Sequence, residues 1–478
     1  MRTEAAYCEL VHDIVDRTTD ALARVNDGPV RVNVPEERLT TVPLNREELV
    51  TLLTPPTATA EQILFAAADQ VRRKAVGDAV HLRAIIEFSN HCERGCWYCG
   101  LRRFNHKLPR YRMTVDEVVE AAQAAVAMGF RTVVLQSGED SWYDERTICT
   151  IIRRIKAILT PTSIPGQVAV TLSLGERPRA EYAAFRAAGA DRYLLKHETA
   201  DPALYRRLHP DMSFENRKQC LGWLRELGYQ VGSGNIVGLP GQTVSTLAED
   251  ITLLAELDVE MAGIGPYIAH PETPLAKLAW GGVRGSSVGG DGGVGGGRGS
   301  GDGSDDGDSG GGSGGGDGDG GSGGDSRGNG ARLPADAVTM TLRTVAVTRL
   351  LLPLTHLPAT SALGTADPQG RQRALQAGAN VVMPDLTPMR YRRYYEIYPN
   401  KICLFEDPRT CFSCLSRMVT GLGRYVATDP GHSPKWPPLA GKDGDSRQSD
   451  PDPARGQEQL PFTNLPTADS KRLPVTSH

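Results

Sequence analysis

Three features are missing from the sequence, and each absence narrows the class of protein. No apolar run reaches about 18 residues, the length that a transmembrane helix needs. The opening residues, MRTEAAYCEL, lack the charged-then-apolar plan of a secretory signal. The formal net charge is -4, so the chain does not have the excess of basic residues that is typical of a nucleic-acid-binding protein. We therefore expect a soluble protein that neither crosses a membrane nor binds nucleic acid.

Cysteine is sparse but clustered. Two close groups hold most of the 9 cysteines. Disulfide scaffolds are small, secreted and cysteine-dense, so close groups in a long chain indicate metal ligation in a reducing compartment. Cys8, Cys149 and Cys220 stand alone, and we expect them to be ordinary buried or surface residues.

Apolar periodicity predicts a helical extension followed by an α/β domain. Residues 1–80 are expected to be helical, with one helix over 60–76 capped by Thr59. From 81 to 425, strand-like and helix-like segments alternate, which predicts a (β/α)8 TIM-type barrel rather than an open doubly wound sheet. The expected strands are 81–88, 131–136, 168–174, 191–195, 229–238, 260–265, 357–362 and 379–384. Catalytic residues should then lie at the carboxyl ends of the strands.

Two segments fall outside this alternation. Residues 281–331 are almost entirely Gly, Ser and Asp, a composition that cannot bury apolar surface and predicts a disordered, low-complexity insert. Residues 426–478 are rich in Pro, Asp, Ser and Gly, which predicts a disordered tail.

The first cysteine group follows the first expected strand, in NHCERGCWYCGLRR. Cys92, Cys96 and Cys99 have the spacing C-x3-C-x2-C, and three thiolates on a short loop can hold a 4Fe–4S cluster with one iron free of protein ligands. That iron is the one that S-adenosylmethionine (SAM) chelates before one electron breaks a C–S bond and releases a 5′-deoxyadenosyl radical. The alternatives are a zinc site, which usually has four ligands in paired C-x2-C spacing, or a chance group. The motif therefore predicts a radical SAM enzyme in which these cysteines are catalytic.

Longer strings around this motif resemble one family. They include EFSNHCERGCWYCGLRR, VVLQSGED, GADRYLLKHETADP, GIGPYIAHPETPLA and NVVMPDLTPMRYR, and the match runs from about residue 60 to 425 apart from the insert. In these strings the chain is similar to the FeFe-hydrogenase maturase family HydE. Biotin synthase and methylornithine synthase are relatives that share the barrel and the cluster. The resemblance implies a closed barrel around a long cavity, with SAM at its top and the substrate inside.

The resemblance also implies a reaction and partners. The family builds the organometallic part of the H-cluster, and the implied substrate is a cysteine-bound iron carbonyl cyanide made by the maturase HydG. The radical would attack that complex and release cysteine-derived carbon, so that a sulfur-bridged di-iron precursor forms and passes to HydF. An electron donor such as ferredoxin or flavodoxin is implied as well. Two alternatives stay open, namely a radical SAM enzyme acting on another small amino-acid-like or sulfur-containing substrate, and a metal–sulfur carrier without catalysis.

Seven residues are implied to contact SAM. Tyr98 would lie near the adenine, and the backbone of the LQSGED segment would meet the methionyl amino group. Glu198, Arg217 and Tyr395 match family positions at the SAM site, and a guanidinium suits the methionyl carboxylate. The backbone contacts would come from Ser137, Gly138 and Glu139. Without the family register, a helix-start carboxylate and a surface helix charge are the simpler interpretations of Glu198 and Arg217.

Eight further residues are implied to line the substrate cavity. They are Gln136, Thr171, Lys196, Met261, Thr360, Ser361, Met383 and Tyr398. A buried hydroxyl without a partner lowers stability, so the adjacent hydroxyls of Thr360 and Ser361 favour binding of an anion or a cyanide-like ligand. Lys196 stands where the family has Arg, which keeps the positive charge but loses the two-pronged grip on a carboxylate.

The second cysteine group lies in KICLFEDPRTCFSC. Cys403, Cys411 and Cys414 have the spacing C-x7-C-x2-C, which predicts an accessory iron–sulfur cluster that some family members hold. Reduced structural cysteines or a partial zinc site remain alternatives. An open cluster requires an oxygen-poor compartment. The Gly/Asp insert and the alanine-rich composition suit a green alga, hence the plastid stroma, with the cytoplasm otherwise.

Overall fold

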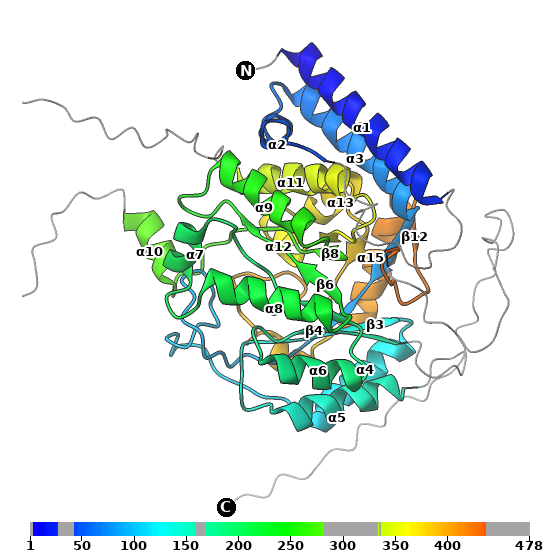
Figure 1. Ribbon diagram of the computed structural model, residues 1–478. Helices are drawn as coiled ribbons and strands as arrows, with labels where there is room; N and C mark the ends of the chain where they lie inside the picture. The colour runs from blue at the N-terminus through cyan, green and yellow to red at the C-terminus, as the bar shows by residue number, and fades with distance from the viewer. Residues whose placement is uncertain (1–2, 27–42, 159–167, 282–332, 334–335, 436–478) are drawn as a thin grey trace, which may run out of the picture. The chain divides into compact units, whose positions relative to one another are not determined.

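A computed structural model describes residues 3–26, 43–158, 168–281, 333 and 336–435 (Figure 1). All but the first residue of the predicted insert at 281–331, and most of the predicted tail, lie outside these ranges. Within the described ranges no helix is both long enough and apolar enough to span a bilayer.

The fold is built on parallel strands. Its strands are β1 (Ala79–Leu82), β2 (Ala84–Ser89), β3 (Thr132–Ser137), β4 (Ala169–Ser173), β5 (Arg192–Leu194), β6 (Gln230–Ser233), β7 (Ile236–Val237), β8 (Met261–Ala262), β9 (Gly265–Pro266), β10 (Pro358–Ala359), β11 (Val381–Val382) and β12 (Tyr425–Val426). A six-stranded sheet has the order β2-β3-β4-β5-β6-β8, so each strand pairs with the one before it, and all these pairs are parallel. The near-continuous apolar runs AIIEFS, TVVLQS and AVTLS are typical of parallel strands buried on both faces.

Helices cover the outside of this sheet. The helices are α1 (Glu4–Asn26), α2 (Arg46–Leu53), α3 (Ala58–Val76), α4 (Val115–Ala127), α5 (Glu145–Lys156), α6 (Arg179–Ala187), α7 (Pro202–Leu208), α8 (Phe214–Glu226), α9 (Val244–Glu256), α10 (Pro274–Gly281), α11 (Ala337–Leu351), α12 (Ser361–Ala366), α13 (Gly370–Gln376), α14 (Met389–Arg392) and α15 (Pro408–Gly421). Figure 1 shows α4, α5, α6 and α8 running side by side over one face of the sheet, and each packs against its neighbour. This arrangement is the α/β alternation that the sequence predicts.

The ends of several elements differ from the sequence prediction. The helix expected over 60–76 is α3, but Thr57 caps it in place of Thr59, because the Thr57 hydroxyl accepts a hydrogen bond from the Ala60 N–H. Thr114 caps α4 as a capping box with Glu117. The strand expected over 357–362 ends early, since Thr360 caps α12.

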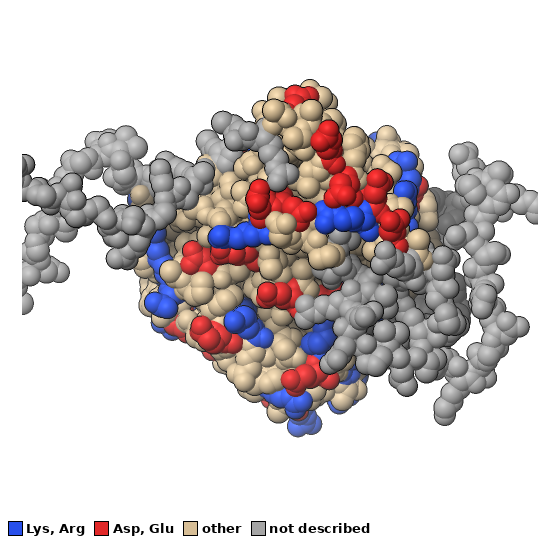
Figure 2. Space-filling model, turned by 45° about the horizontal axis from the view of Figure 1, so that its top comes forward, with Lys and Arg blue, Asp and Glu red and all other residues tan. Residues whose placement is uncertain are grey.

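The N-terminal helices pack on α11, which follows the insert. The hydroxyl of Thr18 in α1 donates to the Leu350 carbonyl at 3.2 Å, and Arg343 in α11 pairs with Glu61 in α3 at 2.5 Å. On the face shown in Figure 2, acidic and basic side chains are interspersed. Ion pairs also join α1 to α2, through Arg17 and Glu48 at 2.9 Å, and α2 to α9, through Arg46 and Glu249 at 2.6 Å.

Residues 427–435, which composition assigns to the tail, bind the amino ends of the strands. Arg192 at the start of β5 donates to the carbonyls of Pro430 and Gly431, each at 2.7 Å. Arg83, which lies between β1 and β2, donates to the Gly431 carbonyl at 3.1 Å. The segment supplies backbone acceptors to buried arginines, a role that composition does not reveal.

A buried arginine ties α11 to the turn before β11, which gives a stability prediction. Arg349 is fully buried and donates to the carbonyls of Gly378 and Pro353 and to the Asn380 side chain. Arg349→Met leaves the buried Gly378 and Pro353 carbonyls without this donor, while Asn380 still accepts from the Leu357 N–H. We therefore expect the free energy of unfolding to fall by about 2–4 kcal/mol. The control Arg373→Met, at a half-exposed ion pair with Asp367, should cost less than about 1 kcal/mol. Urea unfolding followed by circular dichroism measures both, and equal losses would contradict the prediction.

Candidate active site

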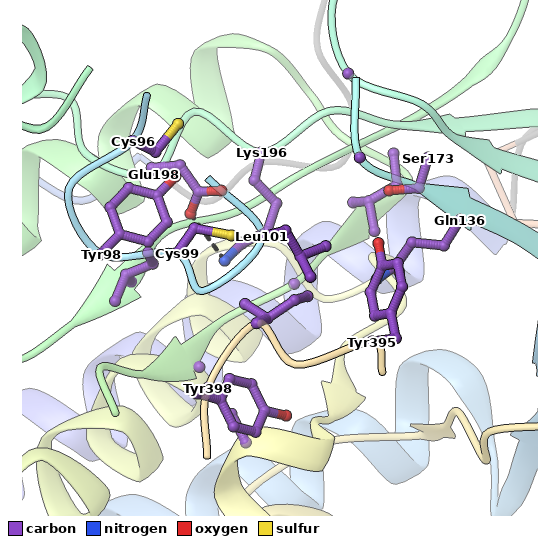
Figure 3. A pocket seen from close by; sticks show the side chains of 18 of the residues that line it. Cys96, Tyr98, Cys99, Leu101, Gln136, Ser173, Lys196, Glu198, Tyr395 and Tyr398 are labelled. Atoms are coloured by element: carbon purple, nitrogen blue, oxygen red, sulfur yellow. Dashed lines mark ion pairs between the residues drawn. The ribbon is translucent and has the colours of Figure 1, made fainter. Parts of the chain in front are cut away.

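A pocket of about 350 Å³ lies at the carboxyl ends of the parallel strands, with the three clustered cysteines in its wall. Figure 3 shows two of them, Cys96 and Cys99, beside Tyr98 and Glu198. Sixteen of the residues predicted for the site line it: Cys92, Cys96, Tyr98, Cys99, Gln136, Ser137, Gly138, Glu139, Lys196, Glu198, Arg217, Thr360, Ser361, Met383, Tyr395 and Tyr398. These residues come from segments far apart in the sequence, and the strand ends bring them together as parallel sheets require.

Two of the residues predicted for the substrate cavity do not line this pocket. Thr171 in β4 is fully buried, and its hydroxyl has no hydrogen-bond partner among the described residues. Met261 in β8 is also buried, and its sulfur accepts a hydrogen bond from Arg83 at 2.9 Å. Arg83 holds Met261 toward the amino ends of the strands, away from the pocket wall.

The cysteine loop is shaped by two polar side chains. The buried Asn90 accepts from the Tyr111 N–H at 2.7 Å and donates to the Tyr394 carbonyl at 2.7 Å. Arg110 donates to four backbone carbonyls of the loop, including that of Leu101 at 2.9 Å. Only glycine fits at position 100, directly after the last cysteine, because a Cβ there would lie 2.1 Å from the Glu396 carbonyl oxygen. The side chains of Asn90 and Arg110 therefore hold the loop in one conformation by bonding to backbone groups.

The backbone of the cysteine loop meets Gly138, the residue that follows β3. A Cβ on Gly138 would lie 2.1 Å from the His91 carbonyl oxygen and 2.7 Å from the Cys92 Cβ, so the backbone after β3 presses directly on the cysteine loop. Burial raises the pKa of Cys92, and burial together with Cys92 raises the pKa of Cys99 to about 12. Such thiols ionise readily only with a cation beside them, so their donor chemistry fits a cluster that replaces the protons.

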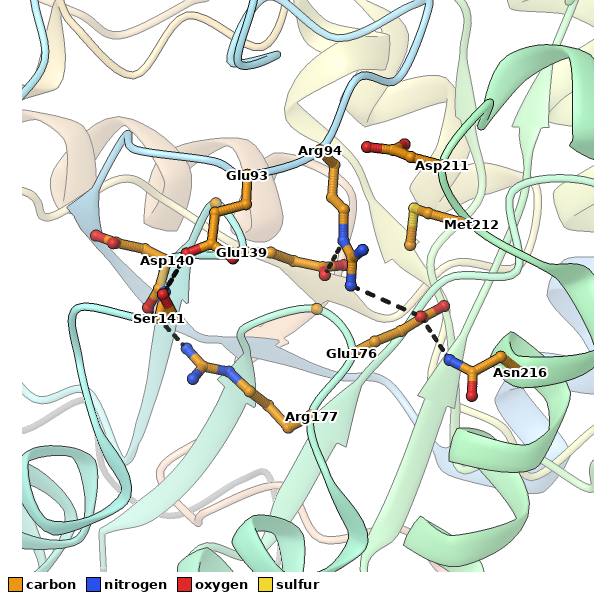
Figure 4. Close-up of polar contacts among 12 residues, drawn as sticks. Glu93, Arg94, Glu139, Asp140, Ser141, Glu176, Arg177, Asp211, Met212 and Asn216 are labelled. Carbon is orange, nitrogen blue, oxygen red and sulfur yellow. Dashed lines mark hydrogen bonds and ion pairs between the residues drawn. The ribbon is translucent and has the colours of Figure 1, made fainter.

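A network of arginines and glutamates adjoins the cysteine loop. Arg94 donates to Glu139 at 2.5 Å (Figure 4). Arg217 donates to Glu176 at 2.8 Å and to the Lys196 carbonyl at 2.9 Å. Arg217 is only 6% exposed, so the interpretation as a surface helix charge is wrong. Burial raises the pKa of Glu139 even though Arg217 and Arg94 oppose it. The positive charges of two guanidiniums therefore balance the negative charges of two carboxylates beside the cysteine loop.

Lys196 and Glu198 form an ion pair in the pocket wall, with Nζ and Oε2 3.0 Å apart (Figure 3). Burial favours the neutral form of Glu198, but the Lys196 ammonium outweighs this and lowers the pKa of Glu198. Glu198 has φ of 65°, a left-handed conformation uncommon for a non-glycine residue. Hydrogen bonds from its own N–H to the Gly234 carbonyl and from the Ile236 N–H to its carbonyl fix it there. Lys196 therefore directs its charge at Glu198.

The hydroxyls of Thr360 and Ser361 are not the unpartnered pair that would favour an anion site. The Thr360 hydroxyl accepts from the Leu363 N–H at 3.3 Å as the cap of α12. The Ser361 hydroxyl accepts from Arg371 at 3.3 Å. Both side chains line the pocket, but each hydroxyl already has a partner in the protein.

Four charged residues of the wall are not predicted from the sequence: Arg94, Glu87, Asp385 and Lys401. Glu87, Asp385 and Lys401 line the pocket and pair with one another. A carboxylate inside the apolar run AIIEFS is a signal that can identify Glu87. Lys401 gives no such signal, because it lies in a loop whose path depends on tertiary structure.

The second cysteine group lies elsewhere, around the start of α15. A hydrogen bond from the Cys411 thiol lowers the pKa of the Cys403 thiol to about 6. Cys411 is buried and Cys414 is exposed. None of the three lines the pocket.

The contact at Gly138 gives a second prediction. Gly138→Ala places a methyl group against the cysteine loop, so we expect the free energy of unfolding to fall by about 1–3 kcal/mol and the iron bound after reconstitution to decrease. The matched control is Gly222→Ala on α8, where a Cβ meets no atom within 4 Å and the helix gains stability. Denaturant unfolding and iron content report the two effects, and unchanged values for Gly138→Ala would refute the close approach.

Comparison with known proteins places these features in a family. The Radical SAM superfamily model matches residues 86–254, a range that contains the cysteine loop. The chain is 46% identical over 370 residues to the FeFe hydrogenase maturase subunit HydE of Thermotoga maritima, covering 77% of this chain and 88% of that protein. It is 29% identical to 3-methylornithine synthase of Methanosarcina barkeri, over 48% of this chain and 64% of that one.

Solved structures agree on the fold. Methylornithine synthase (PylB) superposes with a TM-score of 0.59 at 23% identity, covering 80% of this chain and 94% of that chain. HydG, a maturase of the FeFe-hydrogenase, gives a TM-score of 0.59 at 15% identity over 89% of this chain and 80% of that chain. Identities this low bear on the fold alone. The extended identity to HydE, together with the cysteine loop in the matched range, shows that this chain belongs to the HydE family of FeFe-hydrogenase maturases and is a radical SAM enzyme.

Proposed function

We propose that this enzyme cleaves SAM at a 4Fe–4S cluster held by Cys92, Cys96 and Cys99, and acts on a cysteine-bound iron carbonyl cyanide during H-cluster assembly. When bound, the cluster and SAM together supply a 5′-deoxyadenosyl radical. The observation that carries the proposal is that one pocket joins the three cysteines to a deeper polar wall. The relative from Thermotoga maritima, named as a hydrogenase maturase, supports the substrate class.

The residues around the cysteines suit the polar groups of SAM. The Arg94 and Arg217 guanidiniums would receive its carboxylate, and the backbone of Ser137, Gly138 and Glu139 would receive its amino group, since all five residues line the pocket. Glu198 and Tyr395 would complete this site, and Tyr98 would lie beside the adenine. The Tyr98 hydroxyl and His209 Nε2 lie 3.0 Å apart, which fixes the ring.

We infer that the parallel strands form one closed (β/α)8 barrel around the cavity. Beyond β8, Met261 bridges His356 in parallel just before β10, and the Ala262 N–H donates to the His356 carbonyl at 3.0 Å. On the other side, Ile85 of β2 bridges Asp385, just after β11, in parallel. Together with the pairing of β10 and β11, these contacts support closure of the sheet edges.

The remaining lining residues would contact the substrate. Gln136, Met383 and Tyr398 offer an amide, a thioether and a phenol in the same wall, and Lys196 adds a cation. Thr360 and Ser361 can offer hydroxyl lone pairs beside their helix-cap and arginine contacts. Thr171 and Met261 would enter only if the substrate reached past the pocket toward the amino ends of the strands.

The family implies partners and a second cluster. We propose HydG as the source of the substrate, HydF as the acceptor of the product, and a ferredoxin or flavodoxin as the electron donor. We also propose that Cys403, Cys411 and Cys414 hold an accessory iron–sulfur cluster, which is supported by the hydrogen bond that brings the thiols of Cys403 and Cys411 together.

A second candidate function is radical chemistry on another amino-acid-like substrate. The 29% identity to 3-methylornithine synthase and the shared fold favour it. To distinguish the two candidate functions, the reduced enzyme is given either the iron complex or free amino acids. Only the true substrate should be consumed in proportion to SAM.

The test of the chemistry is formation of 5′-deoxyadenosine from SAM by the reconstituted, reduced enzyme without oxygen. Wild type should form product, and Cys96→Ser should lower the rate by at least about a hundredfold, since the cluster loses a ligand. Cys8→Ser, on α1 away from the pocket, should behave as wild type. Bound iron without product in wild type would favour a metal–sulfur carrier instead.

The ion pair in the pocket wall gives a separate prediction. Lys196→Met leaves Glu198 buried without its cation, so we expect the dissociation constant for SAM to rise by about tenfold or more. Lys196→Arg keeps the charge and should stay within about threefold of wild type. Anaerobic equilibrium dialysis with SAM measures both constants, and an unchanged value for Lys196→Met would show that the pair does not shape the SAM site.

A further inference from the structure

A second set of charges lies in the pocket wall away from the arginine–glutamate network. Lys401 donates to Glu87 of β2 and, at 2.8 Å, to Asp385 just after β11. The side chains of Glu87, Asp385 and Lys401 are 3%, 5% and 9% exposed. The Thr387 hydroxyl accepts from the Glu87 backbone N–H at 2.8 Å. The three side chains are therefore fixed in the wall rather than free at a surface.

One oxygen of this group has no N–H or hydroxyl donor. Glu87 Oε1 accepts from Lys401, but Oε2 is buried and none of the described N–H or hydroxyl groups donates to it. The Glu87 carboxyl instead lies against that of Asp385, and two carboxyl groups can bond to each other only by sharing a proton. Both oxygens of Asp385 are engaged, Oδ2 with Lys401 and Oδ1 with the Thr387 N–H at 2.9 Å. A buried carboxylate oxygen without a donor costs stability unless a bound group supplies one. Since Glu87 lines the pocket, a ligand in the pocket can supply it.

Among the described residues, one cation hydrogen-bonds to this group, the ammonium of Lys401, and the two carboxylates share it. Burial opposes ionisation of Asp385, but Lys401 and, at 3.9 Å, Arg392 lower its pKa. The hydrogen bonds of Arg392 go to carbonyls, including those of Thr387 and Cys403. The other neighbours are the phenols of Tyr111, Tyr395 and Tyr398, which carry no positive charge. Burial and the neighbouring Asp385 carboxylate raise the pKa of Glu87, and a second cation beside the pair would take the place of the proton that the two carboxyl groups share.

We propose that Glu87, with Asp385 and Lys401, is the subsite for the amino group of an amino-acid-like substrate. The orphan oxygen accepts an N–H from that amino group, and its positive charge balances the second carboxylate. An anionic group is disfavoured here, because Lys401 is already flanked by two carboxylates. This inference rests on the proposed function and deepens it, since both candidate substrates of the enzyme contain an amino acid.

The test compares two ligands that differ only in the amino group. L-Cysteine and 3-mercaptopropionate are titrated calorimetrically, without oxygen or reductant, into the reconstituted enzyme with SAM already bound, so that SAM covers the cluster. Wild type should bind L-cysteine at least about tenfold more tightly, as a buried charge-assisted hydrogen bond implies. Glu87→Gln should reduce this preference to within about threefold, while 3-mercaptopropionate still binds as in wild type.

Two further variants keep the test decisive if Glu87→Gln is unstable. Asp385→Asn removes the other carboxylate and should lower the same preference. Glu396→Gln, a half-exposed carboxylate in the loop before Lys401, should leave it unchanged. Equal affinity of wild type for both thiols, as expected if only water meets Glu87, would overturn the inference. A preference that survives in both Glu87→Gln and Asp385→Asn would overturn it too. Formation of 5′-deoxyadenosine is measured in a separate assay, so that a result against the amino-group subsite is distinguished from a result against the radical chemistry.

Discussion

One buried guanidinium, that of Arg217, fixes the part of the site beside the cysteine loop. Arg217 reaches from α8 to Glu176 after β4 and to the Lys196 carbonyl after β5, and lies near Glu139 after β3. A charge buried this deeply is stable only when its donors are all met, so these three strand ends cannot drift apart. The cysteine loop then rests on the same platform through Arg94 and the close contact at Gly138. The positions of the three cysteines are thus set by the ends of the sheet strands on which their loop packs.

Much of this can be predicted from the sequence. The β–α alternation and the C-x3-C-x2-C loop are local signals, and together they predict that the site residues lie at strand ends. Family register, rather than local pattern, identifies Arg217 and Glu198, since a charged residue near a helix start usually faces solvent. The protein buries Arg217 because its partners come from other strand ends, and that information is spread over distant parts of the chain.

Other features are not predictable in this way. The sequence favours an unpartnered strand hydroxyl at Thr360, but the helix-capping role of this residue depends on where the backbone turns. The group of Glu87, Asp385 and Lys401 forms only when β2, β11 and a later loop meet. The role of residues 427–435 is hidden for a similar reason. Their contribution is made by backbone carbonyls, which every sequence contains.

That last segment changes where the folding unit ends. Thr132, Arg192 and Gln230, at the starts of three strands, all bond to residues between Pro430 and Ser433. A fragment cut where the family resemblance fades, near residue 425, would strip these buried donors and acceptors of partners on the side opposite the cysteines. The smallest piece of this enzyme that can fold is accordingly longer than its catalytic motifs, and a stretch poor in apolar residues can be as indispensable to a core as the strands themselves.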